Sequence, residues 1–185
     1  NDGYKSLSDR AKGNKIMQEA LKNKDADAYE KEACKTWIDV RAFGQVFAFK
    51  DNKGMSIGVR GPVSVQSAFS VEPIDIDSIQ ITKSVNSETA LCGVRSTRFP
   101  RAVQHKVSSA LYIIKGSINR QLADKTGFSE EDAEKIKEAL RTLFQNDTSS
   151  ARPDGSMEVR KVYWWRHNCP MGQYSSAKVH RSLQV

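Results

Sequence analysis

The sequence predicts an α+β fold, with antiparallel strands in the core and helices packed beside them. Residues 55–86 hold two groups of alternating Ile and Val, residues 129–144 have helical spacing after a serine, and residues 157–167 alternate again. Alternation with period two is typical of strands, and apolar spacing of three to four residues is typical of helices. Both periods in one chain therefore indicate a mixed fold.

The composition favours a basic, globular protein. The 185 residues are enough for one domain, and 38% are hydrophobic, which allows a buried core. A net charge of +7 favours an acidic partner, with nucleic acid first and a membrane surface second. Cys34, Cys92 and Cys169 are widely separated and form no C-x-x-C pair. We therefore expect a protein of the reducing cytoplasm with no disulfide framework. No apolar run is long enough to span a bilayer, so we expect no membrane segment, and we also expect no cofactor.

The first part of the chain reads as helix. Residues 6–22 predict one amphipathic helix and residues 25–35 a second, both polar enough to suggest a solvated region over residues 1–36. Gly44 then has two readings: a helix C-cap, or a turn beside Arg41 that lets a phosphate approach the backbone. A strand over 46–49 and a hairpin turn over 51–54 follow.

Residues 55–86 predict two β runs joined by a turn, with a bulge or kink at 60–62, where Gly and Pro interrupt the first run. Arg60 and Lys83 lie near the ends of these runs. Cations at strand ends suit a polyanion, although an ordinary hairpin with solvated ends predicts the same pattern. The apolar positions are Ile57, Val59, Val63 and Val65 in the first run, and Ile74, Ile76, Ile79 and Ile81 in the second.

Charge is segregated in the middle of the chain. Residues 83–120 hold seven Lys or Arg and one acid, whereas residues 121–140 hold three Lys and six acids. Residues 87–104 show little periodicity, and Arg95, Arg98 and Arg101 recur every three residues. We interpret this stretch as an exposed basic excursion that contacts a phosphate backbone, with a simple solubilising loop as the alternative.

The rest of the chain predicts a strand over 107–119 with Leu111, Ile113 and Ile114 in the core, then a helix capped by Ser129. Its acidic outer face indicates a packing role. Residues 146–155 predict a polar loop, and residues 157–167 and 178–185 predict strands. Tyr163 and Trp165 have two readings, base stacking or core packing. The helix stripe comprises Ala133, Ile136, Ala139, Leu140, Leu143 and Phe144.

No catalytic motif is evident. The sequence lacks G-x-S-x-G, H-E-x-x-H, P-loop and Rossmann runs. His167, Cys169 and His180 have an atypical spacing for zinc, so we expect no metal site. His105 lies at the end of the basic excursion, where an imidazole is suited to act on an RNA 2′-hydroxyl, but a second catalytic group is not evident.

Long ungapped runs of this chain resemble a known family over residues 37–185. They are WIDVRAFGQVFAF, SIGVRGPVSVQSAFSVEPI, QITKSVN, LYIIKGSIN, LADKTGFSEEDAEKIKEAL, NDTSSARPDGSMEVRKVYWWRH and GQYSSAKVH. These runs are similar to the backbone subunit of type I-C Cascade, a CRISPR-associated RAMP protein of Cas family seven. The family's DVRxFG run falls on residues 39–44, and its RGPV run falls on residues 60–63.

The resemblance implies an RRM-like (ferredoxin-like) antiparallel core over residues 37–185, with large insertions and a thumb-like β excursion at about 82–106. It implies copies that stack along the spacer of a CRISPR RNA, a guide that pairs with a target DNA strand, and cutting by a separate helicase-nuclease. Partners would be the CRISPR RNA, the paired DNA strand, other copies of the chain and other Cascade subunits. The alternative is a RAMP endoribonuclease.

Two departures from the family pattern bear on these expectations. The family's opening strand, with an N-P-N-G-D-P-like run, has no counterpart here, so we expect the chain to lack that core strand. The family's T-M-G-x-K-H run is replaced by residues 101–106, which leaves the register of the thumb open. The residues predicted to contact RNA are Arg41, Gln45, Arg60, Lys83, Ser84, Asn86, Arg95, Arg98, His105, Lys106 and Arg152.

Overall fold

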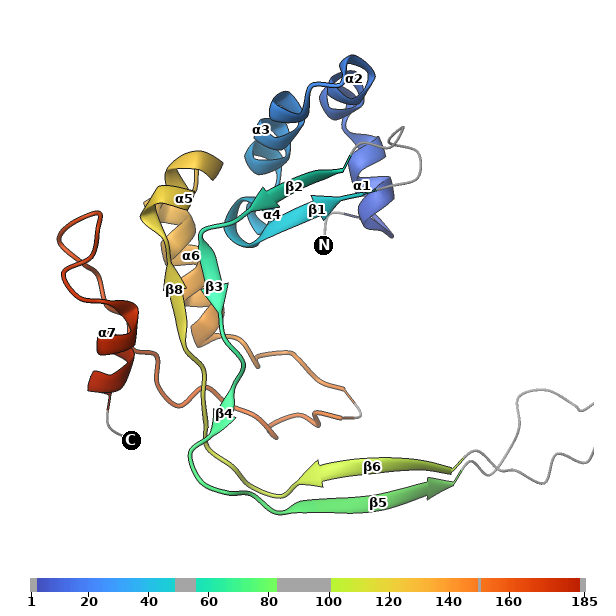
Figure 1. Cartoon of the computed structure of the whole chain (residues 1–185). Helices are drawn as coiled ribbons and strands as arrows, with labels where there is room; N and C mark the ends of the chain where they lie inside the picture. Colours follow the sequence, from blue (N-terminus) through green and yellow to red (C-terminus); the bar gives the residue numbers. More distant parts are fainter. Residues whose placement is uncertain (1–2, 49–55, 83–100, 150, 184–185) are drawn as a thin grey trace, which may run out of the picture. The chain divides into compact units, whose positions relative to one another are not determined.

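The computed structural model describes residues 3–48, 56–82, 101–149 and 151–183, and confirms an α+β fold (Figure 1). The helices are α1 Leu7–Gly13, α2 Lys15–Asn23, α3 Ala26–Thr36, α4 Ile38–Phe43, α5 Arg120–Thr126, α6 Glu130–Arg141 and α7 Ser176–Ser182. The strands are β1 Gly44–Phe47, β2 Ile57–Arg60, β3 Val63–Val65, β4 Phe69–Ser70, β5 Ile76–Thr82, β6 Arg101–Val107, β7 Tyr112–Ile113 and β8 Gly116–Ile118. Within these ranges no helix combines the length and apolar character that crossing a bilayer requires.

The strands pair antiparallel in twos: β1 with β2, β3 with β8, β4 with β7, and β5 with β6. Among the described strands no larger sheet forms, so the RRM-like order that the resemblance implies is not seen. The predicted hairpin within residues 55–86 is wrong, because its first run pairs with β1 and β8 while its second run pairs with β6.

The chain divides into two compact units, and each is described by itself. Unit 1 comprises residues 1–65 and 116–184, and unit 2 comprises residues 66–115. Unit 2 is one excursion from unit 1: the chain leaves after β3 and returns at β8, where Val65 lies opposite Gly116 in the β3–β8 register. This division differs from the predicted boundary at residue 36, because α1–α3 and β1–β2 share one core.

The main core of unit 1 includes residues of the region that the sequence suggested was solvated. Tyr29 and Met17 of that region and Phe47 of β1 are fully buried, and the Tyr29 ring meets the Phe47 ring edge-on at 5.2 Å between centroids. The interpretation of residues 1–36 as solvated was wrong because α1–α3 contact one another partly through alanines. Alanines give only a weak periodic signal in the sequence. The cluster comprises Ala11, Met17, Ala20, Tyr29, Ala33, Cys34, Trp37, Val40, Phe47, Ile57 and Val59.

Local caps explain where these helices begin. The single helix predicted over 6–22 is two helices, because the Asn14 side-chain oxygen accepts hydrogen bonds from the backbone N–H groups of Ile16 and Met17. That is the geometry of an N-cap, so Asn14 separates the end of α1 at Gly13 from the start of α2 at Lys15. Asp25 caps α3 in the same way through the N–H of Ala28.

The predicted cap of α6 is confirmed. The Ser129 hydroxyl accepts from the Asp132 N–H at 3.2 Å, and the Asp132 carboxylate accepts from the Ser129 N–H at 3.1 Å. This reciprocal pair is a capping box. The predicted buried stripe is only half-buried, and Leu143 is 44% exposed.

Two predicted strands toward the C-terminus are wrong. Residues 157–167 form neither helix nor strand, and they pair with no strand among the described residues. Residues 176–182 form helix α7, capped by Ser175, whose hydroxyl accepts from the Lys178 N–H. Short segments of this kind are decided by local caps and by available partners more than by alternation.

Unit 2 consists of paired strands with little buried surface. The β5–β6 ribbon runs from the Ile76–Val107 pair to the Thr82–Arg101 pair. The core positions predicted over 107–119 are wrong in part, because Leu111 and Ile114 are 49% and 47% exposed. Two strands alone cannot enclose an apolar face, so such positions stay exposed within the unit.

Candidate RNA interface

The centre of the candidate interface in unit 1 is a close crossing of two backbone segments. Gly44 follows α4 with φ +82°, and a Cβ placed on it would lie 2.3 Å from the Val59 carbonyl oxygen. A Cβ on Gly61 would lie 2.3 Å from the Ala42 carbonyl oxygen. Only glycine allows both approaches. The segments 39–44 and 60–63, which are distant in sequence, therefore lie side by side.

This geometry confirms the helix-cap reading of Gly44, and the phosphate reading stays a prediction. Its N–H donates to the Val40 carbonyl oxygen, which ends α4, and the residue then begins β1. In the β1–β2 register Gly44 lies opposite Arg60. The glycine is thus a helix cap that also places a backbone turn beside a cation.

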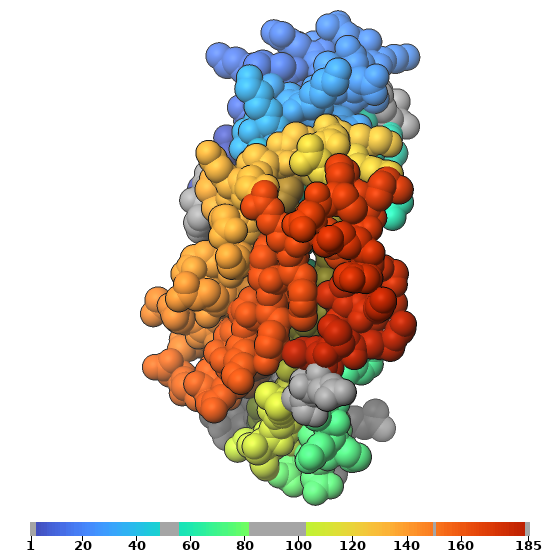
Figure 2. Space-filling model, turned by 90° about the vertical axis from the view of Figure 1, so that its left-hand side faces the viewer, coloured from blue at the N-terminus to red at the C-terminus, as the bar shows by residue number. Residues whose placement is uncertain are grey.

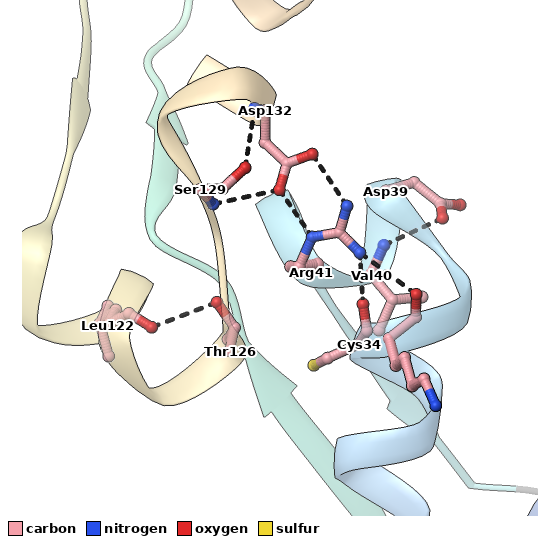
Figure 3. A network of polar contacts seen from close by, with 9 residues as sticks. Cys34, Asp39, Val40, Arg41, Leu122, Thr126, Ser129 and Asp132 are labelled. Atoms are coloured by element: carbon pink, nitrogen blue, oxygen red, sulfur yellow. Dashed lines mark hydrogen bonds and ion pairs between the residues drawn. The ribbon is translucent and has the colours of Figure 1, made fainter.

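Arg41 is held inside unit 1 by Asp132 (Figure 3). Its Nε donates to Asp132 Oδ2 at 2.7 Å and its Nη2 donates to Oδ1 at 2.8 Å, a bidentate pair that joins α4 to the start of α6. Its Nη1 donates to the Cys34 carbonyl oxygen at 2.7 Å. The Arg41 side chain is only 18% exposed and that of Asp132 only 4%.

The electrostatics of this pair follow from its contacts. Hydrogen bonds from Arg41 lower the pKa of Asp132 to about 2, outweighing burial, which acts to raise it, and the Ser129 N–H adds to the lowering. The same carboxylate raises the pKa of Arg41. Both groups are therefore charged across the usual range of pH, and the two charges neutralise each other within the fold.

Asp39, two residues before Arg41, is also partnered internally. Its Oδ1 accepts from Arg10 Nη2 at 3.1 Å, and the Arg10 guanidinium lies 4.6 Å from the centroid of the Trp37 ring. Burial acts to raise the pKa of Asp39, but the Arg10 contact holds it below its usual value. Both charged side chains of the 39–44 run thus stabilise helix junctions.

Gln45 and Arg60 lie at the same end of the β1–β2 pair. Gln45 is opposite Val59, and its side-chain amide donates to the Val46 carbonyl oxygen at 3.1 Å. Arg60 is exposed at the end of β2, and no ion pair of its side chain is found within the described part of the chain. Of the predicted residues in unit 1, Arg60 is the one best placed to meet a phosphate.

Arg152 lies in the predicted polar loop. Its Nη2 donates to Asp147 at 3.2 Å, and its backbone N–H donates to the Ser149 hydroxyl at 3.1 Å. The Arg152 and Asp147 side chains are 46% and 43% exposed. An exposed pair of this kind exchanges readily for a phosphate, because it contributes little free energy.

His105 and Lys106 lie in unit 2, on β6. The His105 Nδ1 is 2.9 Å from the Ser78 hydroxyl across the ribbon, and Lys106 lies opposite Asp77 in the register. Opposite residues of an antiparallel pair share a face, and neighbours along a strand alternate. His105 and Lys106 therefore present to opposite faces of the ribbon.

The model of the CRISPR-associated protein Cas7 family matches residues 3–185. The chain belongs to this family. A search of curated proteins finds no match. Membership in the Cas7 family implies CRISPR RNA and other Cas subunits as partners.

Five residues predicted to contact the RNA lie outside the described residues, so their roles stay predictions. The others are divided between the units, with Arg41, Gln45, Arg60 and Arg152 in unit 1 and His105 and Lys106 in unit 2. Gln45 and Arg60 lie at the same end of the β1–β2 pair, whereas Arg152 contacts Asp147 and Ser149 in its own loop. The five are Lys83, Ser84, Asn86, Arg95 and Arg98.

Asp132 is the residue that sequence reasoning missed. The capping-box spacing of Ser129 and Asp132 was visible, but the partner that Asp132 holds lies 91 residues earlier. Nothing in one sequence joins the two positions. Among the described His, Cys, Asp and Glu residues, no group of three is arranged to hold a metal ion.

Proposed function

We propose that this Cas7-family chain is the RNA-binding backbone subunit of a type I-C Cascade complex and that it is not a nuclease. Copies of it polymerise along the spacer of a CRISPR RNA, and the guide then pairs with a target DNA strand. The observation that supports this most directly is the crossing of residues 39–44 and 60–63. Two runs that the resemblance singled out meet there beside the exposed cation Arg60.

The proposed mechanism is electrostatic and geometric. Arg60, and Lys106 on the β5–β6 ribbon, neutralise phosphates without reading bases, so any guide sequence is accepted. Base pairing between guide and target supplies the sequence information. A separate helicase-nuclease then cuts the target.

Arg41 acts in this proposal as a positioning residue. Its guanidinium joins Asp132 and the Cys34 carbonyl oxygen, which fixes α4 against α3 and α6. Because α4 ends at Gly44, this anchoring sets the position of the turn beside Arg60. Loss of Arg41 would displace the turn and lower RNA affinity indirectly.

The test is RNA affinity against salt, with single-stranded RNA of increasing length and sedimentation of the same samples. Each neutralised phosphate contributes a slope of about −0.7 in the log–log plot. A backbone subunit gives slopes and masses that rise in steps with RNA length. One-to-one binding with a fixed slope contradicts polymerisation, and absence of binding contradicts the proposal as a whole.

A RAMP endoribonuclease is the second candidate, and one contact favours it. The Ser78 hydroxyl at 2.9 Å from His105 Nδ1 orients an imidazole on an exposed ribbon, as a general acid or base requires. Cleavage of a labelled RNA that is lost in His105→Ala, with binding retained, would support this candidate. Equal absence of cleavage in wild type and variant supports the binding subunit.

A further inference from the structure

Residues 157–167 present two aromatic rings on one side of an extended segment. Val162 and Trp164 are half-buried against the body of unit 1, whereas Tyr163 and Trp165 are 48% and 46% exposed. The orange-red surface in Figure 2 shows that this segment lies on the outside of the molecule. Burial thus alternates over residues 162–165, where Tyr163 and Trp165 face solvent.

The segment is tied to α6, which decides which rings face outward. The Lys137 ammonium lies 6.0 Å from the centroid of the Trp164 ring, and Arg166 Nη1 lies 2.9 Å from Glu130 Oε1. The first contact places Trp164 against the helix, and the second is an exposed ion pair next to it. Tyr163 and Trp165 are therefore directed outward by the backbone, without contributing to the core.

The two exposed rings are ordered against each other. Their centroids are 6.0 Å apart and their planes differ by 20°. Nearly parallel rings side by side on the surface resemble the aromatic platforms on which proteins stack successive bases of single-stranded nucleic acid. A base that stacks on the outer face of Trp165 would meet a ring already fixed by Tyr163, which lowers the entropy lost on binding.

The charge around the rings favours an anionic partner. Residues 159–185 contain no Asp or Glu. Lys161 is exposed, between the exposed Arg160 and the half-buried Val162. Its ammonium group has no carboxylate partner within the described residues. Lys178 lies 4.4 Å from the centroid of the Tyr174 ring. The cations of this stretch are Arg160, Lys161, Arg166, Lys178 and Arg181.

We propose that Tyr163 and Trp165 form a stacking platform for bases of single-stranded RNA, with Lys161 beside it as a phosphate contact. This inference rests on the proposed function, that the chain binds RNA, and adds a subsite outside the residues discussed above. Bases have π-faces and phosphates are anionic, so one strand satisfies both features. Arg160 and Arg166 already pair with Glu158 and Glu130, so Lys161 is the cation next to the rings that is left for a phosphate.

The experiment uses the full chain and single-stranded RNA at a fixed low salt concentration. Trp165→Ala should weaken binding by about ten-fold or more, since each base–aromatic stack is worth that much in alanine substitutions. Trp165→Phe keeps a ring and should stay within about three-fold of wild type. Tyr4→Ala is the control, because Tyr4 is 44% exposed yet lies before α1, outside the platform.

Tryptophan fluorescence provides a readout that a structural role would not change. RNA should quench the wild-type emission through stacking on Trp165, and most of that quenching should be lost in Trp165→Phe, although its RNA affinity persists. Trp37 is buried and Trp164 half-buried, so their emission serves as the internal reference.

The outcomes separate the two proposals. RNA binding by wild type with equal affinity in Trp165→Ala overturns the platform and leaves the proposed function standing. No RNA binding by wild type overturns both. Quenching of Trp165 on self-association without RNA identifies the platform as a protein contact, and that also overturns the inference.

Discussion

Two regions of this molecule carry cations that the sequence assigned to RNA, and the structure uses them in opposite ways. At the α4–α6 junction, Arg41 donates to the Asp132 carboxylate and to the Cys34 and Lys35 carbonyl oxygens, and its side chain is only 18% exposed. On the β5–β6 ribbon, Lys106 is exposed and meets only the cross-strand residue Asp77 in the register. One region uses its charge within the fold, and the other leaves its charge exposed.

This difference shows that the type of a charged residue and its local motif do not reveal whether its charge is paired inside the fold or exposed. Arg41 lies in a run that resembles a family motif, and its partner is a carboxylate 91 residues later. The ribbon is rich in exposed apolar residues as well, including Ile79 at 50% and Ile81 at 46%. Buried charges hold structure, whereas exposed charges beside apolar residues favour an interface.

The largest expected effect comes from breaking the junction. Asp132→Ala leaves Arg41 without its partner and removes the capping box, so the free energy of unfolding should fall by about 3 kcal/mol. Urea denaturation of wild type and variant measures this difference in the free energy of unfolding. Glu134→Ala on the same helix is the control, because the Glu134–Lys137 pair is exposed and should contribute less than about 0.5 kcal/mol. Equal effects in the two variants would show that the junction is not a buried cross-link.

The glycine crossing near the junction gives the next largest effect. Gly61→Ala places a Cβ against the Ala42 carbonyl oxygen, and the backbone must move, at a cost of about 2 kcal/mol. Gly58→Ala is the matched control in β2, since a Cβ there meets no atom within 4 Å. Thermal melting of both variants compares them. A Gly61→Ala protein as stable as Gly58→Ala would contradict the close approach.

The pH dependence of stability tests the same pair without disrupting its shape. The pKa of Asp132 is about 2 in the fold, against about 3.9 in an unfolded chain. The folded pKa is the lower one, so the stabilisation is complete above pH 4 and is lost as the pH falls toward 2. The advantage of wild type over Asp132→Asn should shrink by about 2 kcal/mol across that window. A constant difference would mean that Asp132 is not the titrating group.

The smallest effect on stability is expected on the ribbon, where function should respond instead. Lys106→Glu should change the free energy of unfolding by less than about 1 kcal/mol, and should reduce the RNA salt slope by about 0.7 or more. Lys31→Glu on the exposed side of α3 makes the same change in net charge and is the control. Identical RNA affinities in the two variants would remove Lys106 from the interface.

What the sequence predicted correctly was decided by neighbouring residues. The Ser129 cap and the helix after it follow from contacts within four residues, and the Gly44 cap follows from its own backbone. The pairing of strands was not predictable in the same way, because β5 needs β6 across a long connection. The Arg41–Asp132 contact depends on the completed packing of two helices. For residues 157–167, alternation predicted a strand, but it did not reveal whether another strand would pair with it or which rings would be exposed.

The place where unit 2 leaves unit 1 also has a consequence for modularity. Val65 and Gly116 are partners in the β3–β8 register, and just beyond them the Gln66 N–H donates to the Lys115 carbonyl oxygen at 2.8 Å. The two ends of a fifty-residue excursion are thus already joined as if by a hairpin. Because closing a loop costs little more as it lengthens, the excursion can grow, shrink or be exchanged for a two-residue turn while the parent architecture keeps its connectivity. Changes in what unit 2 recognises can in this way evolve without changes in unit 1.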